Sequence, residues 1–134
     1  MADTAIPEYV QQLLRDHIHT YEQLEILMLL HKQPGVVWTL DGLSERLKIS
    51  DSLVDEALQQ LIASGLTVVE GARGGLSRYR VNAPDAQTLV DALARVYADN
   101  PMALMHLLTV NAIERMRTQA VRMFADAFLI RKKK

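Results

Sequence analysis

Between Thr20 and Asn82 the sequence carries a series of helix start and stop signals that few folds can satisfy. Thr20, Thr39 and Ser50 each stand before a segment whose apolar residues recur at helical spacing, and each suits the N-cap position. Gly65 suits the left-handed residue that ends the third of these helices. Two runs that alternate like strands follow, joined by a glycine-rich connection. The predicted order is therefore helix, helix, tight turn, helix and hairpin.

The limits of each predicted element come from its apolar spacing and from the turn residues around it. The capping box from Thr20 to Gln23 starts the most apolar helix, which should lie in the middle of the core. Val36, Val37 and Trp38 favour a short strand after it. The sequence predicts helices over residues 7–17, 21–32, 40–48 and 50–64, strands over 36–38, 66–70 and 77–81, a helix that ends near residue 99, and a long helix from residue 101 to about residue 130.

This order of elements is that of a winged helix-turn-helix. The chain is therefore predicted to be mainly α-helical with one small β-hairpin, an α+β fold that continues into C-terminal helices. Its 134 residues suit one compact domain with an appendage. We expect residues 1–82 to form the winged domain with its N-terminal helix, and residues 83–134 to form a helical extension. Leu40, Leu43 and Leu47 should face the core from the helix at 40–48.

The long C-terminal helix carries an apolar stripe that its own domain is too small to cover. At 1.5 Å per residue the stripe runs for roughly 40 Å. Monomers rarely expose apolar patches of that size, so we expect the C-terminal extension to be a dimerisation region that forms a homodimer. An adaptable ligand pocket lined by methionines is the alternative use of these residues. The expected dimer contacts are Leu108, Ala112, Met116, Ala120 and Phe124.

One segment and the apolar residues after it also carry a family resemblance. The pattern consists of Trp38–Ser50, Val54, Ala57, Leu58, Leu61 and Ser64–Leu66. It resembles the winged-helix regulators of the MarR and PadR type, covers roughly residues 20–82, and is specific for the fold rather than for one family. The resemblance implies that the helix at 50–64 lies in the major groove of DNA. It also implies that Arg73, Arg78 and Arg80 of the wing lie against phosphates.

The charge of the predicted recognition helix departs from this resemblance. The helix carries Asp51, Asp55 and Glu56 and no lysine or arginine. Carboxylates beside a phosphate backbone are unfavourable, although an Asp or Glu can accept a hydrogen bond from cytosine N4. Residues 1–66 hold ten acids and four Lys or Arg, whereas residues 67–134 hold six acids and eleven Lys or Arg. The hydrogen-bonding residues expected to meet DNA from this helix are Ser50, Ser52, Gln59 and Gln60.

Two functions from different classes remain open on the sequence. The first is a dimeric DNA-binding transcriptional regulator whose wing contacts phosphates. The second is a winged helix that binds a protein partner through the acidic face of its recognition helix, without sequence-specific DNA binding. The basic wing favours the first function, and the acids Asp51, Asp55 and Glu56 favour the second.

Several other classes of function are not expected. The chain has no cysteine, which excludes disulfides, thiol nucleophiles and thiolate zinc sites and fits a reducing cytoplasm. His17 and His19 face different ways on a helix, and His31 and His106 stand alone, so no metal, cofactor or catalytic site is predicted. The first residues lack the pattern of a signal peptide, and no apolar run approaches the ~20 residues that span a bilayer. We expect a cytoplasmic protein that is neither an enzyme nor membrane-bound.

Overall fold

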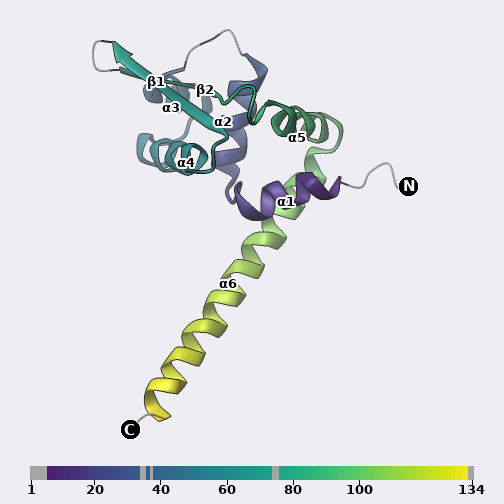
Figure 1. The fold of residues 1–134 in the computed structure, drawn as a ribbon, viewed down its shortest axis with the longest axis vertical. Coiled ribbons are helices and arrows are strands. Elements are labelled where there is room, and N and C mark those ends of the chain that lie inside the picture. Colours follow the sequence, from purple (N-terminus) through teal and green to yellow (C-terminus); the bar gives the residue numbers. More distant parts are fainter. Residues whose placement is uncertain (1–5, 34–35, 37, 74–75, 133–134) are drawn as a thin grey trace.

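The computed structural model describes residues 6–33, 36, 38–73 and 76–132. The predicted turn residues Gly74 and Gly75, and Val37 of the predicted short strand, lie outside the described residues. The fold is a winged helix-turn-helix followed by two further helices (Figure 1). Its elements are α1 (Glu8–Asp16), α2 (Tyr21–Lys32), α3 (Leu40–Leu47), α4 (Asp51–Ala63), β1 (Thr67–Arg73), β2 (Leu76–Val81), α5 (Gln87–Asp99) and α6 (Pro101–Lys132).

The predicted caps start and end the helices of the winged domain. The Thr20 hydroxyl accepts from the Gln23 backbone N–H at 3.1 Å, and the Gln23 side chain accepts from the Thr20 N–H at 2.9 Å. Thr39 accepts from the N–H of Gly42 at 3.1 Å and starts α3 in the same way. Gly65 has a φ of 78° after the end of α4, a conformation that residues with a Cβ rarely adopt. These local predictions are confirmed.

The turn between α3 and α4 is held by the backbone and by one side chain. Lys48 takes the left-handed conformation, with a φ of 61°. The Ser44 hydroxyl donates to the carbonyl oxygen of Ile49 at 2.5 Å, and the N–H of Ile49 donates to the carbonyl of Ser44 at 3.2 Å. Ser50 then caps α4, its hydroxyl accepting from the N–H of Leu53 at 3.4 Å. These bonds fix the direction in which α4 leaves the turn.

The hairpin is longer than the sequence predicted. β1 pairs antiparallel with β2, with Thr67 opposite Val81 and Val69 opposite Tyr79. The prediction that β1 ends at residue 70 is wrong, because an irregularity between Glu70 and Arg73 lets pairing continue past Gly71.

The predicted strand at 36–38 is wrong in its length among the described residues. Only Trp38 pairs there, in a single bridge to Tyr79, and the Tyr79 N–H donates to its carbonyl at 2.9 Å. Val36 is exposed and does not pair with a strand. It therefore has none of the neighbouring side chains on a sheet that favour the extended conformation. The bridge nevertheless ties the start of α3 to the middle of β2.

Helix α2 lies at the centre of the core, as predicted. It contacts α3, α4, α5 and β2, and its aliphatic side chains from Leu24 to Leu30 are buried on every side. Among residues expected to face the core from α3, Leu43 is fully buried, whereas Leu40 and Leu47 are only partly buried. The fully buried side chains include Leu24, Ile26, Leu27, Leu43, Leu58 and Leu61.

Helix α6 leaves the body of the molecule as a single rod (Figure 1). Its 32 residues span roughly 48 Å at 1.5 Å per residue. α1 and α5 pack against its first part, where Leu104 and Leu108 are buried. Further along, Met116 is 64% exposed and Phe124 is 74% exposed. No helix in the described part of the chain is long and apolar enough to cross a membrane.

A hydrogen bond links Tyr97 of α5 to Glu25 of α2. The Tyr97 hydroxyl donates to the Glu25 carboxylate at 2.6 Å. This hydrogen bond is the largest cause of the rise in the pKa of Tyr97 to about 12, with burial a smaller one. The same carboxylate, by its charge, raises the pKa of Tyr21.

The capping box should make a measurable contribution to the free energy of unfolding. Thr20→Ala removes the acceptor for the Gln23 N–H, and we expect it to lower the free energy of unfolding by about 1 kcal/mol. Thr118→Ala, on the exposed surface of α6, is the control and should change it by less than about 0.5 kcal/mol. Urea denaturation measures both variants. Equal stability of the Thr20 variant and the native chain would contradict the role of the cap.

The Tyr97–Glu25 bond should make stability fall at alkaline pH. The folded state holds the Tyr97 proton more tightly than the unfolded chain, whose tyrosines titrate near pH 10. Stabilisation is therefore complete below pH 10 and is lost as the pH rises toward 12. An ultraviolet titration of the phenolates should show a late phase whose amplitude Tyr97→Phe reduces and Tyr9→Phe leaves in place. A late phase of unchanged amplitude in Tyr97→Phe would contradict the assignment.

Candidate nucleic-acid interface

Helix α4 buries one face and leaves the opposite face to solvent. Val54, Ala57, Leu58 and Leu61 are buried against the core. Because successive residues turn by about 100° around a helix, the residues furthest from this face are on the other side. The exposed outer residues are Ser52, Asp55, Glu56 and Gln59. None of these four side chains forms a hydrogen bond or an ion pair with another residue that the structure describes.

Two residues predicted to meet DNA from α4 have other surroundings. Ser50 is exposed, but its hydroxyl is used as the N-cap of the helix. Gln60 lines a hollow of about 270 Å³ between α4 and the start of α2, together with Leu53, Glu56 and His19. The structure therefore brings Ser52 and Gln59 together on the outer face and turns Gln60 toward α2.

The three predicted arginines of the wing differ in what surrounds them. Arg80 donates through Nε to the Glu70 carboxylate at 2.5 Å, so its charge is balanced across the hairpin. Arg78 lies opposite Glu70 in the strand register, is exposed, and has no ion pair among the described residues. Arg73 ends β1, and its side chain lies outside the described part of the wing. Arg78 is thus the wing cation whose described surroundings leave it available to an anion.

Two further cations near α4 were not singled out from the sequence. Arg46 is in the last turn of α3 and Lys48 is the left-handed residue of the turn, and both are exposed. They precede the N-terminus of α4, where phosphates approach a helix in the major groove. The signal that could have revealed them is the run Arg46-Leu47-Lys48 directly before the capping serine.

The residues expected to form a dimer contact fall into two environments along α6. Leu108 is 7% exposed and belongs to the chain's own core, and Ala112 is partly buried. Met116, Ala120 and Phe124 are exposed. The predicted stripe therefore runs continuously from the core of the molecule onto the open rod.

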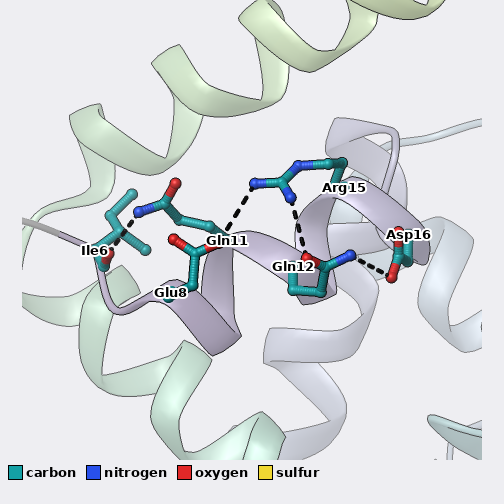
Figure 2. A network of polar contacts seen from close by, with 6 residues as sticks. All are labelled: Ile6, Glu8, Gln11, Gln12, Arg15 and Asp16. Atoms are coloured by element: carbon teal, nitrogen blue, oxygen red, sulfur yellow. Dashed lines mark hydrogen bonds and ion pairs between the residues drawn. The ribbon is translucent and has the colours of Figure 1, made fainter.

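A network of polar side chains lies along the exposed side of α1 (Figure 2). Gln12 donates to Asp16 at 2.7 Å and accepts from Arg15 at 3.0 Å, while Gln11 donates to the carbonyl of Ile6 at 2.8 Å. An open groove of about 620 Å³ begins beside Arg15 and continues along α6. In the part of the chain that the structure describes, no three His, Cys, Asp or Glu side chains gather where they could hold a metal ion.

Comparison with known proteins shows a shared fold. No protein-family model matches the sequence, and no curated protein matches it. Among solved structures, MepR, described as a transcription regulator of the Staphylococcus aureus multidrug efflux pump MepA, is 18% identical. That match covers 90% of this chain and 88% of MepR, with a TM-score of 0.56.

Two other solved structures give the same picture. A mutant of ZitR from Lactococcus lactis is 21% identical over 85% of this chain and 78% of its own, with a TM-score of 0.55. A complex of S. aureus MepR with DNA is 16% identical over 87% of this chain and 86% of its own, with a TM-score of 0.55. These likenesses extend over the helices that follow the wing as well as the winged domain.

Proposed function

We propose that this chain is a dimeric, DNA-binding transcriptional regulator. The observation that carries the proposal is the outer face of α4, where Ser52 and Gln59 are exposed and have no partner among the described residues. MepR shares the fold, is described as a transcription regulator, and has been solved in complex with DNA. The proposal puts the protein in the cytoplasm and gives it no catalytic role and no cofactor.

In this proposal the phosphate contacts come from both sides of α4 rather than from α4 itself. Asp51, Asp55 and Glu56 repel a phosphate backbone from the helix. In chain order the wing cation Arg78 follows α4, on β2, and the turn cations Arg46 and Lys48 precede its start. In such an arrangement the flanking cations contact the DNA phosphates. The helix α4 itself offers only hydrogen-bonding groups to the bases.

The second copy is proposed to cover the open part of α6. Met116, Met123 and Phe124 are 64%, 71% and 74% exposed, which leaves an unusually apolar surface on a single chain. The same surface on a second copy is its simplest complement, as in most homodimers. Two winged domains joined in this way can place their α4 helices in successive major grooves, about 34 Å apart.

The alternative function is a protein-interaction module. The observation that favours it is that Leu53, which is 44% exposed on α4, lies beside Glu56 at the hollow near α2. An exposed leucine at a hollow that Glu22 and Glu56 also line suits a basic partner with an apolar anchor.

DNA binding should depend on charge at the wing. Arg73→Ala with Arg78→Ala is expected to weaken binding to every sequence alike, and to reduce the slope of log K against log salt by about 0.9 per lost phosphate contact. Gln59→Ala should matter only at a preferred site. Glu70→Gln removes an acid and releases Arg80, so it should tighten binding. Fluorescence anisotropy with labelled duplexes over a range of salt measures all of these changes.

The control for these variants is Arg95→Ala with Arg122→Ala, which removes the same charge from exposed positions on α5 and α6. It should leave the affinity near that of the native chain. Equal losses in the control and in the wing variant would refute specific phosphate contacts by the wing. Absence of DNA binding at low salt by the native chain would support the protein-interaction module instead.

Dimerisation should fail when charge is placed on the apolar part of α6. Phe124→Glu puts a carboxylate into the proposed contact, where it would be buried without a partner. Since Phe124 is exposed in the single chain, the variant should still fold but should give a monomer mass in light scattering. Thr118→Glu, an exposed polar position of the same helix, is the control and should remain dimeric. A monomeric native chain at micromolar concentration would contradict the dimer.

A further inference from the structure

A hollow of about 450 Å³ lies away from α4, where the end of α2, the end of β2 and the start of α5 meet. Its volume falls within the range of about 300–1,000 Å³ that is common for small-molecule sites. Part of its lining is apolar and buried, since Leu30 is 2% and Val81 is 8% exposed. Neither the proposed DNA contacts of α4 nor the dimer contacts of α6 account for it.

The ionisable side chains that line this hollow are all basic. They are His31, Lys32 and Arg80, and Gln87 adds an amide at the start of α5. No Asp or Glu is among the described residues that line it. The hollow therefore combines an apolar wall with a rim of basic side chains, a combination that suits an organic anion.

Two acids outside the lining form hydrogen bonds with these basic groups. Asp91 accepts from His31 at 2.7 Å and from Gln87 at 2.8 Å. Glu70 accepts from Nε of Arg80, and the carbonyl of Val81 accepts from its NH1 at 3.4 Å. These bonds orient His31 and Arg80 but leave donors of the guanidinium group unused.

Lys32 provides the charge that is not balanced. It is exposed at the last turn of α2, and within the part of the chain that the structure describes it forms no ion pair. Its ammonium group can donate three hydrogen bonds as a mobile point charge, which is how lysines commonly bind phosphates. The donors around the hollow thus come from three elements, α2, β2 and α5.

We propose that this hollow binds a small organic phosphate. The phosphoryl group would meet Lys32 and the free donors of Arg80, and the apolar body of the ligand would lie against Leu30 and Val81. A phosphoryl group offers three oxygens to donors that approach from different directions, whereas a carboxylate offers two in one plane. Because its walls come from the winged domain and from α5, an occupied hollow stabilises the packing of α5 on α2. The site does not depend on whether the chain binds DNA.

Phenyl phosphate is a suitable probe, since it joins a phosphoryl group to a compact apolar body. Titrated into the full chain and followed by ¹H–¹⁵N NMR, it should give saturable shifts at residues 30–32, 80–83 and 87–89. Lys32→Gln should weaken the affinity by about tenfold or more, as expected for the loss of a charged hydrogen bond. Arg117→Gln, which removes the same charge from exposed α6, should leave it unchanged. Phenol, which lacks the phosphate, should cause no saturable shifts at these residues.

Three results would overturn the proposal. The first is an absence of saturable shifts with phenyl phosphate at millimolar concentration. The second is an equal loss of affinity in Lys32→Gln and Arg117→Gln, which would show attraction to the overall charge only. The third is a set of shifts confined to α4 or the wing. Since Lys32 is exposed, its variant should fold, and a rise in melting temperature with phenyl phosphate, seen in the native chain but not in Lys32→Gln, gives an independent measurement.

Discussion

The burial of α2 on all sides is the constraint on which the rest of the structure depends. Leu24, Ile26 and Leu27 are fully buried, so a neighbouring element must cover each side of this helix. α4, β2 and α5 provide this cover together with α3. Each of these elements packs part of its apolar surface toward α2, and only the surface turned away from the core is open to solvent. The outer face of α4, the wing and the basic hollow are the surfaces that remain.

These surfaces differ in charge, and the difference decides which of them can attract DNA. α4 presents acids to solvent and gains no basic residue of its own, so any attraction for a polyanion has to come from its neighbours. The hairpin provides one such source in Arg78, while Arg80 is already paired with Glu70. The turn before α4 provides another in Lys48. This residue has a left-handed backbone, and the hydrogen bond from the Ser44 hydroxyl to the Ile49 carbonyl closes the turn around it. The proposed regulator would therefore contact the DNA phosphates through the wing and the turn before α4, and it would discriminate weakly among bases.

Much of the fold could be predicted from the sequence because its signals are local. The caps at Thr20, Thr39 and Ser50 and the glycine after α4 each act within one turn of chain, and all four are present. Features that depend on distant segments were not predictable. The irregularity that prolongs β1 needs the register of β2, and the Arg80–Glu70 pair joins two strands. The orientation of Gln60 toward α2 likewise depends on how two helices pack.

The most direct test of the account is whether the outer face of α4 is covered when DNA binds. The chain has no cysteine, so a single cysteine at position 52 can carry a fluorescent label, and one at exposed position 88 on α5 provides the comparison. Quenching of each label by iodide is measured with and without duplex DNA. The account predicts that DNA protects the label at position 52 and leaves that at position 88 accessible. Equal accessibility of the label at position 52 with and without bound DNA would contradict it.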